Sequence, residues 1–246
     1  TIKSLFSFCL ENMIDSEMTS TSQVCFYVID QLIPLMMSEK HFDENLTFIP
    51  QIISACLERC KNFDLNNFYL GMSVLSEIAQ YISIPPEEEL NNKLSAKQKI
   101  ATNAMINSLQ AVINCHFEHN KILSMETTGN VLTGSPVASG EIEEQNPPKE
   151  TEKGPLDKQF ISYFAAFDDS YIESIVIPNI IDRFKNTSET MLSTTFTSEF
   201  LLYLSRAKPD LISSVLSPKL EKFFSSSKLA RKLFWCQLLA STFIPC

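Results

Sequence analysis

The chain has 246 residues, of which 44% are hydrophobic and 20% are charged, a composition that supplies a buried core and excludes a fully disordered protein. No apolar stretch approaches the ~18 residues that cross a bilayer, which excludes an integral membrane protein. The presence of only five Gly and a net charge of −9 disfavour enzymes that bind nucleotides through glycine-rich loops and argue against general nucleic-acid binding.

The first half of the chain is predicted to form about five amphipathic helices, because its apolar residues recur at spacings of three and four. Pro85-Pro86 cannot continue the fourth helix, and Glu87 to Glu89 indicate a solvated helix start. We assign residues 1–119 to a helical block. Its expected helices are Ile2–Met13, Val24–Met37, Leu46–Cys60, Leu65–Ile82 and residues 97–118, with polar breaks at Thr19–Ser22, His41–Glu44, Lys61–Asp64 and Ile84–Glu89.

Residues 120–154 are expected to be a disordered acidic loop or linker. Four of the five Gly, the pair Pro147-Pro148 and scattered Glu and Lys lie between Thr127 and Gly154, almost without periodic apolar residues. Such a long segment is unusual as a simple connection. It fits either an insertion in a helical array or a linker between two helical blocks.

Residues 155–246 are predicted to form a second block with two helical hairpins. Asp168-Asp169 is an N-cap signal before the apolar stripe over 171–184, and a second helix follows over 187–208, where Pro209 ends it. The pattern then restarts and predicts helices over 210–224 and 229–239.

A proline recurs in the first helix of each hairpin. Pro178 and Pro218 lie forty residues apart, within the repeat length of about 40–47 residues that HEAT and armadillo proteins use. A proline inside a helix removes a hydrogen bond and bends the helix, so its recurrence predicts a curved helix that wraps a neighbour. Pro34 and Pro50 have similar surroundings but break the period. The predicted fold is an all-α, HEAT/armadillo-type helical-hairpin solenoid fragment with one long disordered loop, the first block being a degenerate version of the array or simply helical.

The second block resembles a known family. The run from Ile177 to Glu189, followed by Phe200-Leu201-Leu202 and Asp210-Leu211, is similar to the amino-terminal HEAT region of the general-control translational activator family. That family places a Leu-Pro-Thr-Ile-like helix, an Arg-Ser-Pro-Glu-like turn and an Asp-Leu-Ser-like helix start at comparable separations. The resemblance covers about residues 167–226, and Ser188 stands where the family tends to have proline. It implies a very large cytoplasmic HEAT-repeat protein that associates with ribosomes and helps activate the kinase responding to uncharged tRNA.

No arrangement of catalytic residues is visible in the sequence. The chain has three His and no P-loop, dinucleotide or kinase signature. Cys56 and Cys60, with Cys115 and His119, are a conceivable zinc site, but paired Cys-x-x-Cys motifs are absent. The seven irregularly spaced cysteines favour buried, reduced thiols. We therefore expect neither enzymatic activity nor a metal or other cofactor.

The charge is distributed unevenly along the chain. Residues 1–119 carry a net charge of −7, residues 120–158 carry −3 and residues 159–246 carry +1. The candidate partner-binding residues form a basic cluster in the last hairpin that could meet ribosomal RNA or an acidic protein. The alternative is the ordinary solvated side of an amphipathic helix. The cluster consists of Lys219, Lys222, Lys228, Arg231 and Lys232.

The sequence thus predicts a cytoplasmic, non-catalytic scaffold and reads as a piece of a longer chain. The expected partners are proteins, the ribosome and a protein kinase among them, with no small-molecule substrate, no membrane insertion and no sequence-specific nucleic-acid binding. An adaptor in intracellular transport or vesicle trafficking is the alternative function, and an enzyme with an unrecognised site is the third.

Overall fold

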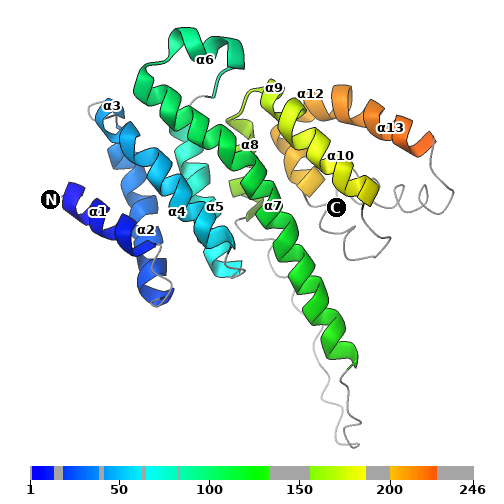
Figure 1. Ribbon diagram of the computed structural model, residues 1–246, viewed down its shortest axis with the longest axis horizontal. Helices are drawn as coiled ribbons and strands as arrows, with labels where there is room; N and C mark the ends of the chain where they lie inside the picture. The colour runs from blue at the N-terminus through cyan, green and yellow to red at the C-terminus, as the bar shows by residue number, and fades with distance from the viewer. Residues whose placement is uncertain are drawn as a thin grey trace, which may run out of the picture.

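The computed structural model describes residues 2–13, 19–38, 42–61, 65–82, 84–132, 156–186 and 200–225, and their regular secondary structure is helical. The helices follow one another in chain order, from α1 at one end of the long axis to α13 at the other (Figure 1). The predicted all-α class is confirmed for these residues. The elements are α1 (Ile2–Met13), α2 (Thr19–Met36), α3 (Phe42–Asn45), the 3-10 turn η1 (Leu46–Phe48), α4 (Ile49–Lys61), α5 (Leu65–Tyr81), α6 (Glu87–Lys93), α7 (Ala96–Leu132), α8 (Leu156–Ala165), α9 (Asp169–Tyr171), the π turn η2 (Ile172–Val176), α10 (Ile177–Asn186), α12 (Pro209–Leu211), the π turn η3 (Ile212–Leu216) and α13 (Ser217–Ser225), and residues 200–207 are also helical.

Two of the expected polar breaks are helical in the structure. Helix α1 has the predicted bounds, but α2 begins at Thr19, so the break expected over Thr19–Ser22 is wrong. The hydroxyl of Ser22 is buried and donates to the carbonyl of Met13 at 2.9 Å. The break expected over His41–Glu44 is wrong from Phe42 onward, because these residues form the short helix α3. Asn45 of α3 donates its side-chain amide to the carbonyl of Met36 at 2.8 Å. In both places a polar side chain satisfies the end of the preceding helix from within the next helix, rather than marking an irregular connection.

Helices also extend into segments that the sequence analysis assigned to a polar break or to the long loop. Helix α6 forms directly after Pro86, with three acidic residues in its first turn, where they favour the positive end of the helix dipole. Helix α7 continues to Leu132, so the loop expected from residue 120 is helical as far as 132, and its remainder lies outside the described residues. The carboxyl-terminal part of α7 extends past its neighbours (Figure 1). Helix α8 was not predicted at all.

The helices contact one another as two rows. Helices α1, α4 and α7 and the turn η2 follow one another in the first row, and α2, α5 and α8 follow in the second. The rows meet where α1 packs on α2 and α4 packs on α5. Helices α1, α2, α4 and α5 therefore each pack against a partner in the other row and against a neighbour in their own row.

The two predicted blocks share one hydrophobic core at the junction of α7 and α8. Phe160 on α8 stacks on Tyr203 with ring centroids 5.3 Å apart and meets His116 of α7 edge-on at 5.2 Å. Phe200 packs against the same His116 ring at 5.3 Å. An isolated parallel bridge between Ile84 and Phe167 also joins the blocks. The described part of the chain after α7 therefore packs against the first block.

The forty-residue repeat is visible as a repeated local structure. The π turns η2 and η3 begin at Ile172 and Ile212, and each is closed by an N–H that donates five residues back, from Ile177 and from Ser217. The next residue is proline in both helices, Pro178 and Pro218. Proline lacks an N–H, and its ring collides with the carbonyl four residues earlier in a regular α-helix. The wider π turn before each proline moves that carbonyl away from the ring. The helix irregularity that the prolines predicted is therefore a π turn in both repeats.

Candidate interaction surface

Two of the five predicted partner-binding residues lie in the described part of the chain. Lys219 and Lys222 are both exposed on α13. Three residues apart on a helix, they share one face. Lys228, Arg231 and Lys232 lie outside the described residues. The structure therefore places a pair of exposed cations on α13, the last of the described helices, and leaves the full cluster a prediction.

Lys219 has a neighbour of opposite charge in the preceding repeat. Its Nζ atom lies 3.8 Å from Oε1 of Glu173, and the two side chains are 44% and 51% exposed. An ion pair this long and this exposed is worth about 0–1 kcal/mol and is screened by salt. Glu173 therefore leaves Lys219 able to contact an anionic partner.

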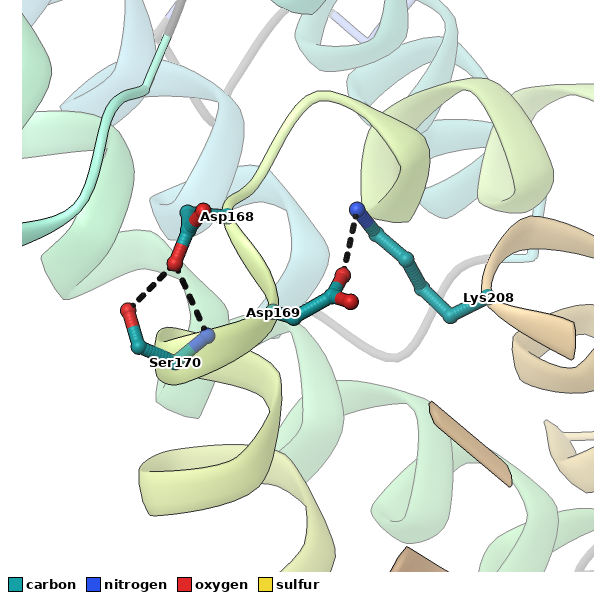
Figure 2. Close-up of polar contacts among 4 residues, drawn as sticks. All are labelled: Asp168, Asp169, Ser170 and Lys208. Carbon is teal, nitrogen blue, oxygen red and sulfur yellow. Dashed lines mark hydrogen bonds and ion pairs between the residues drawn. The ribbon is translucent and has the colours of Figure 1, made fainter. Parts of the chain in front are cut away.

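The first repeat helix begins at a well-formed N-cap. Oδ1 of Asp168 accepts the backbone N–H of Ser170 at 3.0 Å and the Ser170 hydroxyl at 2.6 Å (Figure 2). The hydrogen bonds from Ser170 are the main reason that the pKa of the Asp168 carboxyl is lowered, and the charge of Lys208 contributes. The backbone N–H of Asp168 donates to the carbonyl of Ile84 at 3.1 Å. The predicted N-cap is thus confirmed, and it also ties this helix to the first block.

Lys208 joins the two repeats from the equivalent helix start, forty residues later. Its Nζ lies 3.0 Å from Oδ1 of Asp169, and its side chain is 16% exposed (Figure 2). The sequence analysis did not single out this pair. Lys208 is the residue of the second repeat that corresponds to Asp168 in the first, forty residues earlier. Its contact with Asp169 arises because the two helix starts lie side by side in the fold. Lys208 is therefore engaged within the chain and does not belong to the exposed basic surface.

Three of the four residues considered for a zinc site are buried. The free thiols Cys56, Cys60 and Cys115 lie in the core. Burial raises the pKa of Cys56, with the neighbouring Cys60 as a second cause, and burial likewise raises the pKa of Cys60 and Cys115. Raised pKa values disfavour the thiolate, which is the form of cysteine that acts as a nucleophile. The side chain of His119 lies outside the described residues.

His116 belongs to an aromatic cluster of the core. Its side chain is buried, and its ring contacts phenylalanines of the described helices, among them Phe68 at 6.5 Å and Phe117 at 5.5 Å. In the part of the chain that the structure describes, no group of three or more His, Cys, Asp or Glu side chains is arranged to hold a metal ion. None of the described helices is both long and apolar enough to cross a membrane.

No protein-family model matches this chain, and searches of curated proteins and of solved structures find no match either.

Proposed function

We propose that this chain is a HEAT-type helical-repeat scaffold whose outer surfaces bind other macromolecules. The observation that carries the proposal is the recurrence, after forty residues, of a helix start, a π turn and a proline at equivalent positions of α9–α10 and α12–α13. Two rows of neighbouring helices with one shared core support the same architecture. Arrays of this kind stack short repeats against their neighbours only and thereby present long continuous surfaces for binding.

The partner we propose is the ribosome, in the cytoplasm, with a role in activating the kinase that responds to uncharged tRNA. The resemblance of residues 167–226 to the general-control translational activator family supports this assignment. Electrostatics supports it too, because residues 159–246 carry a net charge of +1 in a chain of −9, and Lys219 and Lys222 are exposed within them. Exposed lysines favour the phosphate backbone of ribosomal RNA without reading its sequence.

Co-sedimentation with purified ribosomes at several salt concentrations tests the proposal. The double variant Lys219→Glu/Lys222→Glu is expected to weaken binding and to make it less dependent on salt, because each lost phosphate contact lowers the slope of log K against log salt by about 0.7–0.9. The control is Lys97→Glu/Lys158→Glu, which makes the same charge change at two exposed lysines on α7 and α8.

Ribosome binding that the control retains and the Lys219/Lys222 variant loses supports the assignment. Equal losses in both variants would mean that net charge alone governs sedimentation and would contradict a local binding surface. Recovery of coat or transport-receptor proteins without ribosomal proteins would replace the ribosome by the partners of a trafficking adaptor.

A further inference from the structure

Two cysteines from neighbouring helices meet in the core, Cys9 on α1 and Cys25 on α2. Both are free thiols, and both side chains are buried. The Cys9 side chain is hydrogen-bonded to that of Cys25, so the two sulfur atoms are in direct contact.

The packing of α1 on α2 brings the same two positions together. Helices α1 and α2 contact each other, and the Ser22 hydroxyl donates to the carbonyl of Met13, the last residue of α1, at 2.9 Å. Cys9 precedes Met13 by four residues, and Cys25 follows Ser22 by three. Each cysteine is therefore about one helical turn from this contact and on the same face of its helix. Since Met13 and Ser22 are themselves buried, the two cysteines face each other across the α1–α2 contact.

The position of Cys9 and Cys25 on two different helices suits a disulfide. A disulfide needs Cβ atoms about 3.5–4.5 Å apart. Cys56 and Cys60 lie four residues apart on α4, where the helix itself holds the Cβ atoms about 5–6 Å apart. Cys9 and Cys25 are not held to that spacing, because neither helix fixes the distance to the other.

We propose that Cys9 and Cys25 are a redox-sensitive pair, which a small disulfide such as oxidised glutathione converts into an intramolecular disulfide that locks α1 to α2. The thiolate of one cysteine attacks oxidised glutathione, which forms a mixed disulfide and releases one glutathione. The second thiolate then attacks the protein sulfur of the mixed disulfide and releases the other glutathione. The two cysteines are thereby oxidised, and the two glutathione thiols that form take up the two protons that the cysteines lose.

The packed helices protect both thiols from rapid oxidation. Burial is the main reason that the pKa of Cys9 is raised to about 11, and the neighbouring Cys25 contributes, so the attacking thiolate is scarce. Exchange therefore requires α1 to separate locally from α2. When α1 returns, it brings the second sulfur onto the mixed disulfide. The pair is thus expected to respond to a sustained change of redox conditions and not to a brief one.

Equilibration of the whole chain with glutathione redox buffers, in native buffer and in concentrated urea, tests the proposal. The fraction of disulfide at each glutathione ratio gives the effective concentration of one thiol at the other. Folding favours the disulfide by the same factor by which the disulfide stabilises the fold, and for a loop of about 15 residues that factor is roughly a hundredfold. We therefore expect an effective concentration that is at least about tenfold higher in the native chain than in urea.

Peptide mass identifies the bridge. Cleavage at glutamate separates the two cysteines, because Glu11 and Glu17 lie between them, so the bridge appears as two joined peptides that reduction separates. Cys25→Ser is expected to abolish the joined peptides, and the matched control Cys56→Ser, at another buried thiol, is expected to retain them.

Hydrogen exchange measures the lock itself. In the oxidised chain the amides of α1 are expected to exchange at least about tenfold more slowly, because the bridge opposes separation of α1 from α2. An effective concentration no higher in the native chain than in urea would overturn the proposal, as would a native bridge from Cys9 or Cys25 to any other cysteine. Unchanged exchange of the α1 amides after oxidation would overturn the lock.

Discussion

Removing the Tyr163 hydroxyl tests whether the two helical blocks share a single core. Tyr163 on α8 and Ser108 on α7 are buried, and their hydroxyl oxygens lie 2.5 Å apart. The Ser108 hydroxyl also lies 2.6 Å from the carbonyl oxygen of Met105, which can only accept. Ser108 therefore uses its single proton there, and Tyr163 donates to Ser108.

Because Tyr163 donates and Ser108 accepts, Tyr163→Phe and Ser108→Ala are predicted to lower the free energy of unfolding by different amounts. Tyr163→Phe removes one neutral hydrogen bond and leaves Ser108 bonded to Met105, so the free energy of unfolding falls by about 1 kcal/mol. Ser108→Ala leaves the Tyr163 hydroxyl buried without its acceptor and lowers the free energy of unfolding by about 2 kcal/mol, because that group also loses its hydration. The double variant is expected to lose less than the sum of the two, since both changes remove the same bond.

Urea denaturation followed by circular dichroism measures these differences. Tyr171→Phe is the control, because the Tyr171 hydroxyl is buried without a hydrogen-bond partner among the described residues, and its removal is expected to be neutral or stabilising. A Tyr163→Phe variant as stable as the parent chain, or less stable than Ser108→Ala, would refute the assigned bond and with it this link between the blocks.

Two further predictions concern helix ends and packing. Asp168→Ala is expected to lower the free energy of unfolding at neutral pH by about 1 kcal/mol through loss of the N-cap. Because the folded-state pKa of Asp168 is lowered, its contribution is present above the unfolded pKa of ~3.9 and lost as pH falls through the folded pKa, so urea titrations in acid should show a smaller difference. Gly71→Ala is expected to destabilise by about 1–3 kcal/mol in thermal melts, despite the helix propensity of Ala, because the added Cβ would meet the Cys60 sulfur at 2.9 Å. Gly71→Ala added to Cys60→Ala should destabilise less, and equal effects in both backgrounds would argue against this contact.

Local sequence signals predicted the helices that begin with strong caps or contain a clear apolar period. The bounds of α1 and the N-cap at Asp168 follow from such signals. Helix α8 escaped prediction because Phe160, Tyr163 and Phe164 follow directly on a stretch of Gly, Pro and charged residues. Its stability comes from aromatic contacts with residues distant in sequence, such as His116. Thr19 to Ser22 resembled a break because short polar residues favour turns locally, whereas packing on α1 keeps them helical.

The sequence predicted which lysines of the candidate surface are exposed, but it did not predict the contacts between helices. The exposure of Lys219 and Lys222 follows from the polar side of an amphipathic helix. The ion pair between Lys208 and Asp169 could not be predicted, because it depends on how two helices forty residues apart stack. Likewise, the contact between Cys9 and Cys25 depends on how α1 packs on α2, a property that helical periodicity alone does not specify.

Deletion of residues 169–208 tests the repeat array most directly, since it removes one complete forty-residue period. Asp168 would then precede Pro209 and could cap α12 as it now caps α9. The apolar residues of η3 and α13 would take over the contacts of their equivalents, Ile212 for Ile172, Leu216 for Val176 and Leu220 for Ile180. The account predicts a folded chain with a cooperative thermal transition, whereas deletion of only 189–208, half a period, should not give one. An unfolded or aggregated product of the full-period deletion, or equal stability of the two deletions, would contradict the repeat.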